Sequence, residues 1–218
     1  NPIINPKGSA SDSNVDFNKD WKFVLKDSAH YSYTSYVPGD EWKKVNLPHD
    51  WSVGLPYDSI SGEGCVAFLQ GGIGWYSKSF PTTISANQKC YIVFDGVYNN
   101  SEYWINGKKL GYHLSGYAPF YFDVTDYLNP NEDNRMTVRV DHSHYADSRW
   151  YTGSGIYRDV KMIVTDRLHI PVWGTFVTTP VVTDKYAKVN NQITVRNSYS
   201  EPRTAVVEIV YKDNKGNI

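Results

Sequence analysis

Residues 94–128 read FDGVYNNSEYWINGKKLGYHLSGYAPFYFDVTDYL, and residues 135–160 read RMTVRVDHSHYADSRWYTGSGIYRDV. These two stretches decide the fold, because strand-like runs in them alternate with residues that favour turns. Asn106-Gly107 lies between the runs 101–105 and 108–113. Both central residues of a type I′ turn need a positive φ, which Asn and Gly tolerate. The pattern predicts a β-hairpin at this point and a fold built from strands.

Strand-like runs continue on both sides of this hairpin. Trp21, Phe23 and Leu25 alternate as on a half-buried strand. The other expected strands are residues 42–48, 75–80, 91–94, 121–124, 136–141 and 156–165. No convincing apolar stripe at helical spacing is present, and residues 124–128 are expected to form at most one short turn. We therefore predict an all-β fold, a jelly-roll β-sandwich of the galactose-binding-domain-like type.

The chain is predicted to hold one complete domain and part of a second. The jelly roll is expected over residues 1–166, with 1–15 as a flexible polar arm. New strand patterns begin after it, with Val189, Ile193, Val195, Val207 and Ile209 as inward-facing candidates. Residues 167–218 make only about half of an immunoglobulin-like β-sandwich of about 100 residues. The last residues, KGNI, read as a turn with no strand after it, so we expect a fragment of a longer protein.

Composition excludes several classes of protein. The net charge is −1 and the pI is about 6.6, so no strong field favours nucleic acid or an anionic membrane surface. No apolar run approaches the roughly 20 residues that span a bilayer. The 7 Trp, 18 Tyr and 8 Phe are the compositional outlier. Most are expected to pack in a β core, although aromatic rings also stack on the apolar faces of pyranoses.

No metal or cofactor is expected. Cys65 and Cys90 do not form a disulfide framework, and both pairing and buried free thiols stay open. His142 and His144 would share one face of a strand, but zinc would need a third ligand such as Asp141 or Asp147. Solvated or hydrogen-bonded histidines are the favoured interpretation.

Two glycine-containing segments deserve separate interpretations. Residues 48–74 form a long loop with little periodicity, and such loops in compact domains tend to be functional. It opens with His49, Asp50 and Trp51. Gly153 and Gly155 lack the strand–loop–helix context of a phosphate loop, so a tight turn with close backbone approach is predicted for them instead.

Several motifs, in order along the chain, resemble glycoside hydrolase family 2, the family of β-galactosidases, β-glucuronidases and β-mannosidases. FNKDWKF resembles its opening strand, LPHDWS its Pro-His-Asp-Trp motif, and GWYSKSF a later strand. The stretch from residue 94 to 128 resembles its long hairpin segment, and SRWYTGSGIYRDV resembles the closing signature of its N-terminal sugar-binding domain. WGTFVTTP looks like the start of its immunoglobulin-like domain.

This resemblance implies a catalytic (β/α)₈ barrel elsewhere in the protein, carrying two glutamates in a retaining mechanism. Retention needs two carboxyl groups about 5–5.5 Å apart, and a barrel needs about 250 residues. The present chain is expected to be inactive alone. It would brace the barrel and line one side of the sugar subsite. The implied partners are a carbohydrate substrate and the downstream barrel of the same chain, with a homo-oligomer possible and neither nucleic acid nor membrane involved. The family's habits favour a periplasmic or secreted protein.

Four residues are candidates for substrate binding. Asp50 matches a family position that reaches into the sugar subsite, where a carboxylate accepts hydrogen bonds from hydroxyls. The alternative for Asp50 is an Asx-turn or a cap, while His49 and Trp51 would orient its loop. Asp147, Arg149 and Trp150 precede the closing strand in a loop that faces the family's active-site mouth. Their alternative is an internal Arg–Asp pair, with Trp150 in the core, and for Trp150 the core is favoured. Arg158 and Asp159 are expected to pair structurally.

The favoured function is therefore the non-catalytic N-terminal part of a β-galactosidase-type glycosidase. A stand-alone carbohydrate-binding module and a structural or assembly domain are the two rivals, since a jelly roll hosts all three.

Overall fold

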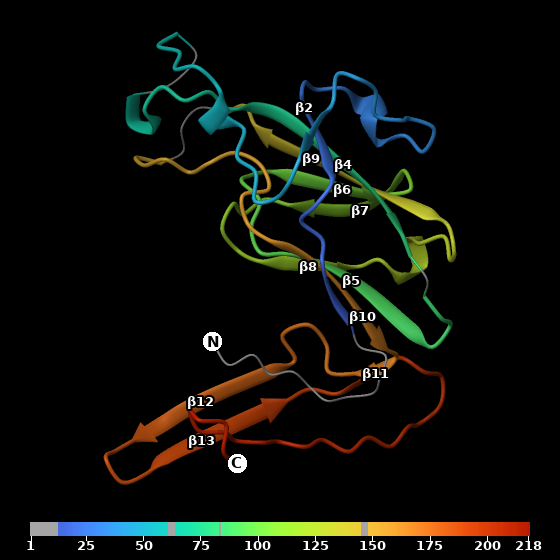
Figure 1. The fold of residues 1–218 in the computed structure, drawn as a ribbon, viewed down its shortest axis with the longest axis vertical. Coiled ribbons are helices and arrows are strands. Elements are labelled where there is room, and N and C mark those ends of the chain that lie inside the picture. Colours follow the sequence, from blue (N-terminus) through green and yellow to red (C-terminus); the bar gives the residue numbers. More distant parts are fainter. Residues whose placement is uncertain (1–12, 61–63, 83, 145–147) are drawn as a thin grey trace. The chain divides into compact units, whose positions relative to one another are not determined.

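A computed structural model describes residues 13–60, 64–82, 84–144 and 148–218 (Figure 1). The chain divides into two compact units, Asn1–Thr165 and Asp166–Ile218. Helical structure in the described ranges is confined to the short 3₁₀ segments η1 (Ala29–Ser32), η2 (Ser52–Gly54), η3 (Gly64–Val66) and η4 (Thr125–Tyr127). Among these described segments, none is long and apolar enough to cross a membrane as a helix. The predicted all-β fold class is confirmed.

The first unit contains a six-stranded sheet in the order β3-β2-β4-β9-β6-β7. Its strands are β2 (Trp21–Leu25), β3 (Lys43–Val45), β4 (Gly72–Pro81), β6 (Ser101–Ile105), β7 (Lys108–His113) and β9 (Asp133–His142). Asn106 and Gly107 have φ of 51° and 77°, so the predicted β6–β7 hairpin is confirmed with its positive-φ turn. β4 and β9 pair antiparallel over their whole length of 10 residues each.

A four-stranded sheet in the order β1-β10-β5-β8 forms the second layer. Its strands are β1 (Ser13–Asp16), β5 (Gln88–Phe94), β8 (Phe120–Asp123) and β10 (Val160–Asp166). One core cluster draws from both sheets, which makes the unit a sandwich. Phe94 of β5 joins the layers, because its ring lies 5.2 Å from that of Phe120 in its own sheet and 4.9 Å from that of Tyr103 in the other.

A second aromatic cluster covers the outer face of the six-stranded sheet. Successive side chains of a strand point to opposite faces, so Val24 lies outside where Trp21 and Phe23 lie inside. Tyr31 and Trp42, from the segment between β2 and β3, pack on this outer face with Val24 and Trp75. The predicted alternation fails at Leu25, which shares the inner parity but is exposed. The core does not reach the end of β2.

The second unit contains two small sheets. β11 (Leu168–His169) pairs with β14 (Arg196–Asn197), and β12 (Thr175–Val182) pairs with β13 (Ala187–Ile193). The inward-facing prediction is wrong for Val189, Val195, Val207 and Ile209, which are exposed. Their side chains meet no opposing layer within this unit. Residues 202–212 form no strand despite their apolar alternation.

The structure also bears on the predicted N-terminal arm and on the two cysteines. Residues 1–12 of the predicted arm lie outside the described residues, and Ser13–Asp16 form β1 against β10. Cys90 is buried in the core and Cys65 is exposed. Burial raises the pKa of the Cys90 thiol to about 12.

Candidate functional site

Asp50 is fixed by three hydrogen bonds. Its Oδ1 accepts the backbone N–H of Ser52 and that of Ser154, both at 3.0 Å. Its Oδ2 accepts the hydroxyl of Tyr151. The bond from Ser52, two residues later, is the Asx-turn that was the alternative to sugar binding. The other two bonds tie the carboxylate to a segment about 100 residues away, so Asp50 joins the Pro-His-Asp-Trp loop to the closing signature.

The neighbours of Asp50 hold this loop in place. Trp51 is buried, stacks on Phe23 with ring centroids 5.6 Å apart, and donates its backbone N–H to the carbonyl of Ser154 at 3.2 Å. His49 Nδ1 lies 2.8 Å from the Tyr76 hydroxyl. Burial lowers the pKa of His49, and the charge of Asp50 opposes this only in part. His49 is therefore a neutral packing residue near pH 7.

A network of hydrogen bonds connects β9 and the closing signature to the loop of residues 48–74. The Ser52 hydroxyl donates to the carbonyl of Gln70 at 2.6 Å, and it also lies 2.6 Å from the Ser154 hydroxyl. A hydroxyl has one hydrogen, so Ser154 must donate to Ser52. His142 Nδ1, which lies 2.7 Å from Ser154 Oγ, must then carry a hydrogen itself. These hydrogen bonds therefore run from His142 through Ser154 to Ser52 and Gln70, which both lie in the loop of residues 48–74.

Gly153 and Gly155 form the predicted close approach. Their φ values are 79° and 106°. A Cβ on Gly155 would lie 2.1 Å from the Tyr76 hydroxyl oxygen, and one on Gly153 would lie 3.1 Å from Asp50 Oδ2. Only a residue without a side chain lets this segment wrap around the carboxylate.

The other three predicted site residues have different environments. Asp147 lies outside the described residues. Arg149 and Trp150 are exposed, so the favoured placement of Trp150 in the core is wrong. Trp150 has 61% of its surface accessible, and its Nε1–H donates to the Tyr117 hydroxyl at 3.2 Å. That bond joins two exposed aromatic side chains.

The expected Arg158–Asp159 pair is also wrong. Arg158 donates at 3.4 Å to the carbonyls of Asp95 and Tyr117, and Asp159 accepts from the Asn18 side chain at 3.0 Å. Each of the two side chains therefore has its own partners, and they do not pair with each other. Within the described ranges, no group of three or more His, Cys, Asp or Glu side chains is placed to hold a metal ion.

Two surface depressions are present near these elements. Asp50 lines one of about 370 Å³, together with hydrophobic residues that include Phe23, Trp51 and Leu55 and the charged residues Glu41 and Lys43. This volume falls at the small end of the roughly 300–1,000 Å³ of ligand pockets. The depression offers Asp50 one hydrophobic wall.

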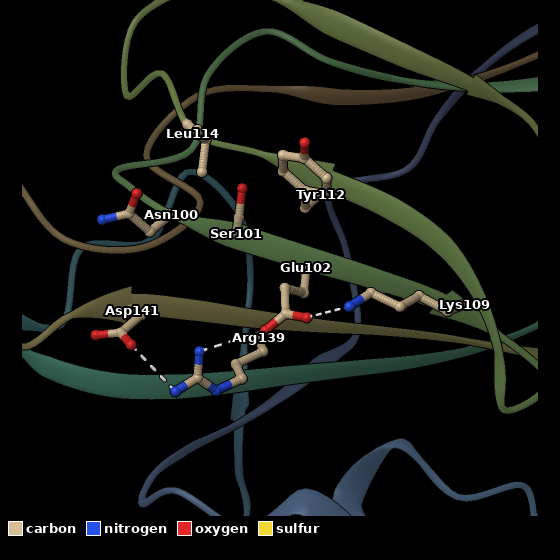
Figure 2. Close-up of a pocket in the computed structure, with 8 residues that line it drawn as sticks. All are labelled: Asn100, Ser101, Glu102, Lys109, Tyr112, Leu114, Arg139 and Asp141. Carbon is tan, nitrogen blue, oxygen red and sulfur yellow. Dashed lines mark hydrogen bonds and ion pairs between the residues drawn. The ribbon is translucent and has the colours of Figure 1, made fainter.

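The second depression, of about 210 Å³, lies across β9, β6 and β7 (Figure 2). Arg139 Nη2 contacts Asp141 Oδ2 at 3.1 Å, and Arg139 Nη1 contacts Glu102 Oε1 at 3.5 Å. Glu102 also pairs with Lys109. Arg139 further contacts Asp27 at 3.1 Å, which ties the segment after β2 to the sheet. Burial alone would lower the pKa of Arg139, but the hydrogen bonds and charges of Asp27 and Asp141 raise it.

Sequence reasoning missed Tyr151 and Ser154 as site residues. Both lie inside the SRWYTGSGIYRDV motif, but nothing in that string indicates a bond to Asp50. The backbone N–H groups of His49 and Trp51, which donate to the carbonyls of Ile156 at 2.8 Å and Ser154 at 3.2 Å, bring the two motifs together. The signal available was the presence of two motifs of the same family in one chain.

Comparison with known proteins gives consistent matches. Residues 14–166 match the model of "Glycosyl hydrolases family 2, sugar binding domain". A β-galactosidase of Bacteroides ovatus is 40% identical over 204 residues, which cover 92% of this chain and 24% of that protein. A crystal structure of a β-glycosidase from Bacteroides vulgatus superposes with a TM-score of 0.79 at 38% identity, covering 87% of this chain and 25% of that one. A β-glucuronidase structure gives a TM-score of 0.78 at 26% identity, covering 89% and 23% of the two chains. The chain spans about a quarter of the length of these relatives.

Proposed function

This chain belongs to glycosyl hydrolase family 2 and contains its sugar binding domain, and from that premise we propose that it is the non-catalytic N-terminal part of a retaining glycosidase of β-galactosidase type. The whole protein would hydrolyse terminal β-glycosides. Residues 1–166 would form the jelly-roll domain, and residues 167–218 would begin an immunoglobulin-like domain. The catalytic carboxylates would lie in a barrel outside these 218 residues.

The fixed carboxylate of Asp50 carries this proposal. A carboxylate whose geometry is set by three hydrogen bonds is ready to accept a sugar hydroxyl without further ordering. Its place beside Trp51 and Leu55 gives a polar acceptor against a hydrophobic wall, as in many ligand sites. Arg149, Trp150 and Asp147 would extend the same side of the subsite. The domain supplies one wall, and the barrel would supply the reacting groups.

The β-galactosidase type is supported by the 40% identity to the Bacteroides ovatus enzyme. Glucuronidases are also frequent among the relatives. The p-nitrophenyl β-galactoside, β-glucuronide and β-mannoside should therefore be compared as substrates of the parent enzyme, and we expect the highest kcat/KM for the galactoside. A higher value for the glucuronide would overturn this assignment.

Asp50 is tested by substitution in the parent enzyme. Asp50→Ala should lower kcat/KM about 10- to 100-fold, the loss expected for a charged hydrogen bond to substrate. Asp16→Ala changes an exposed carboxylate on β1 and is the matched control. Unchanged kinetics in Asp50→Ala would remove Asp50 from the site. The 218-residue chain alone should hydrolyse none of the three substrates.

A stand-alone carbohydrate-binding module is the second candidate, favoured by the depression in Figure 2. Tyr112, which is 67% exposed, lines this depression beside its charged residues. Titration of the 218-residue chain with galactose, glucuronate and mannose should show negligible binding, because one open wall cannot bury a monosaccharide. Binding at millimolar affinity or better that Tyr112→Ala abolishes, and that Tyr57→Ala leaves intact, would favour the module.

A further inference from the structure

Tyr151 is joined to Asp50 in a way that restricts what a ligand can do there. The Tyr151 hydroxyl donates its single hydrogen to Asp50 Oδ2. Burial of the phenol raises its pKa, and the hydrogen bond and the charge of Asp50 raise it further, so the hydroxyl stays protonated throughout the physiological range. With its hydrogen committed, the Tyr151 oxygen can only accept a hydrogen bond from a ligand.

The free hydrogen-bonding capacity of Asp50 lies on Oδ2, the oxygen that accepts from Tyr151. Oδ1 already accepts two backbone N–H groups, those of Ser52 and Ser154, at 3.0 Å each. A carboxylate oxygen offers about two lone-pair positions, so Oδ1 is satisfied. Oδ2 accepts one hydrogen bond, from Tyr151, and has a second position left among its described contacts. Asp50 Oδ2 and the Tyr151 oxygen are therefore two adjacent acceptors.

The backbone of Gly153 passes close to this pair of acceptors, and the side chains next to it are exposed. Gly153 takes a φ of 79°, and a Cβ there would lie 3.1 Å from Asp50 Oδ2. Tyr151 has 43% of its surface accessible, and the preceding residue, Trp150, is 61% exposed and donates its Nε1–H to the Tyr117 hydroxyl at 3.2 Å. Tyr151 is therefore joined to Asp50 while part of its surface stays accessible to solvent and to a ligand.

We propose that Tyr151 is a substrate-contacting residue, and that it and Asp50 together accept hydrogen bonds from two neighbouring hydroxyls of one sugar ring. The inference rests on the proposed function, because it requires Asp50 to line the sugar subsite. It adds a chemical selection: both acceptors have no hydrogen to give, so the ligand must donate from both positions. When a substrate lacks either hydroxyl, one acceptor is left desolvated and unpaired. The enzyme then binds the transition state of that substrate less tightly.

Tyr151→Phe in the parent enzyme tests this role. The variant removes the acceptor oxygen and keeps the ring, so kcat/KM for p-nitrophenyl β-galactoside should fall about tenfold, the loss for one neutral hydrogen bond. Tyr157→Phe is the matched control, because that hydroxyl donates to the carbonyl of Gly116 at 2.7 Å in the same segment and does not contact Asp50. Tyr157→Phe should leave kcat/KM unchanged.

Substrate analogues separate contact from mere support of the loop. With monodeoxy p-nitrophenyl β-galactosides, one analogue should be hydrolysed equally by the wild type and Tyr151→Phe, because it lacks the hydroxyl that Tyr151 accepts. A structural role would give the same loss with every analogue. In a double-mutant cycle, Asp50→Ala and Tyr151→Phe should combine to less than the product of their separate effects.

The outcomes distinguish the two proposals. A loss in Asp50→Ala with wild-type kinetics in Tyr151→Phe would overturn the role of Tyr151 and leave that of Asp50. Equal losses in Tyr151→Phe with all the deoxy analogues would also overturn it, in favour of loop support. Wild-type kinetics in Asp50→Ala would overturn the proposed function itself.

Discussion

Both units of this chain contain paired strands with apolar side chains, but the units differ in whether a second layer covers those side chains. Phe94 in β5 is fully buried between two sheets, whereas Phe176 in β12 is 64% exposed on a two-stranded sheet. Both belong to antiparallel strand pairs, β5 with β8 and β12 with β13. The difference shows that pairing strands and building a core are separate steps. A hairpin forms from local pattern and turn chemistry, but its apolar face is buried only when a second layer packs on it.

Core truncation should give the largest contrast between the units. Phe94→Ala should lower the free energy of unfolding of the first unit by about 3–5 kcal/mol, because burial is lost and a cavity is left between the sheets. Phe176→Ala should cost within about 0.5 kcal/mol, the range of exposed sites. Urea unfolding of the 218-residue chain, followed by tryptophan fluorescence, measures both.

If the alanine variant does not fold, Phe94→Leu provides the same comparison. It should lower the free energy of unfolding by a smaller amount. Similar losses at Phe94 and Phe176 would show that the β12–β13 hairpin is packed in solution, against the contrast drawn here.

Substitution of two glycines with positive φ should give a loss of stability of intermediate size, and the two positions can be compared directly. Gly107→Ala should destabilise by more than about 2 kcal/mol, because left-handed backbone is strained and the new Cβ would lie 2.1 Å from Thr34 Oγ1. Gly216→Ala has nothing within 4 Å of its Cβ, so only the backbone cost of about 1 kcal/mol remains.

Thermal unfolding followed by circular dichroism compares the two alanine variants. Equal shifts would mean that the contact of the β6–β7 turn with Thr34 contributes nothing beyond backbone strain.

The smallest expected effect is the pH dependence that His49 contributes to the stability of the first unit. Burial lowers the pKa of His49, so the unfolded chain takes up a proton near pH 6.5 and the folded chain does so only at lower pH. The unfolded state then binds more protons, and stability falls as pH drops below about 6.5. The slope contributed by His49 cannot exceed about 1.4 kcal/mol per pH unit.

Urea midpoints at pH 7.5, 6.5 and 5.5 measure this slope, and His49→Gln should reduce it. A variant that keeps the full wild-type slope would assign the pH dependence to other groups.

Much of the fold could be predicted from local pattern. The strand bounds of β6 and β7 and the Asn106-Gly107 turn follow from residues adjacent in sequence, because φ preference and alternation act over a few residues. The exposure of Val189 and Val195 could not be predicted in the same way. Their alternation indicates a buried face, and only the presence or absence of a covering layer decides whether that face is buried.

The candidate site was predictable in part. Asp50 was identified from its motif, and its Asx-turn from the residue type. The exposed ring of Trp150 was not, because a tryptophan carries the same apolar surface in a core and on a rim. Tyr151 and Ser154 were missed because their contacts with Asp50 cross about 100 residues of chain.

The sequence alone therefore determined the strands β6 and β7, the turn between them and the family motifs, since each depends on neighbouring residues and backbone preference. Only the tertiary structure decided which faces are covered, in which direction the His142–Ser154–Ser52 hydrogens point, and that Tyr151 faces the carboxylate of Asp50. These are decided when the sandwich closes, because hydrogen-bond partners and burial depend on which distant segments that closure brings together.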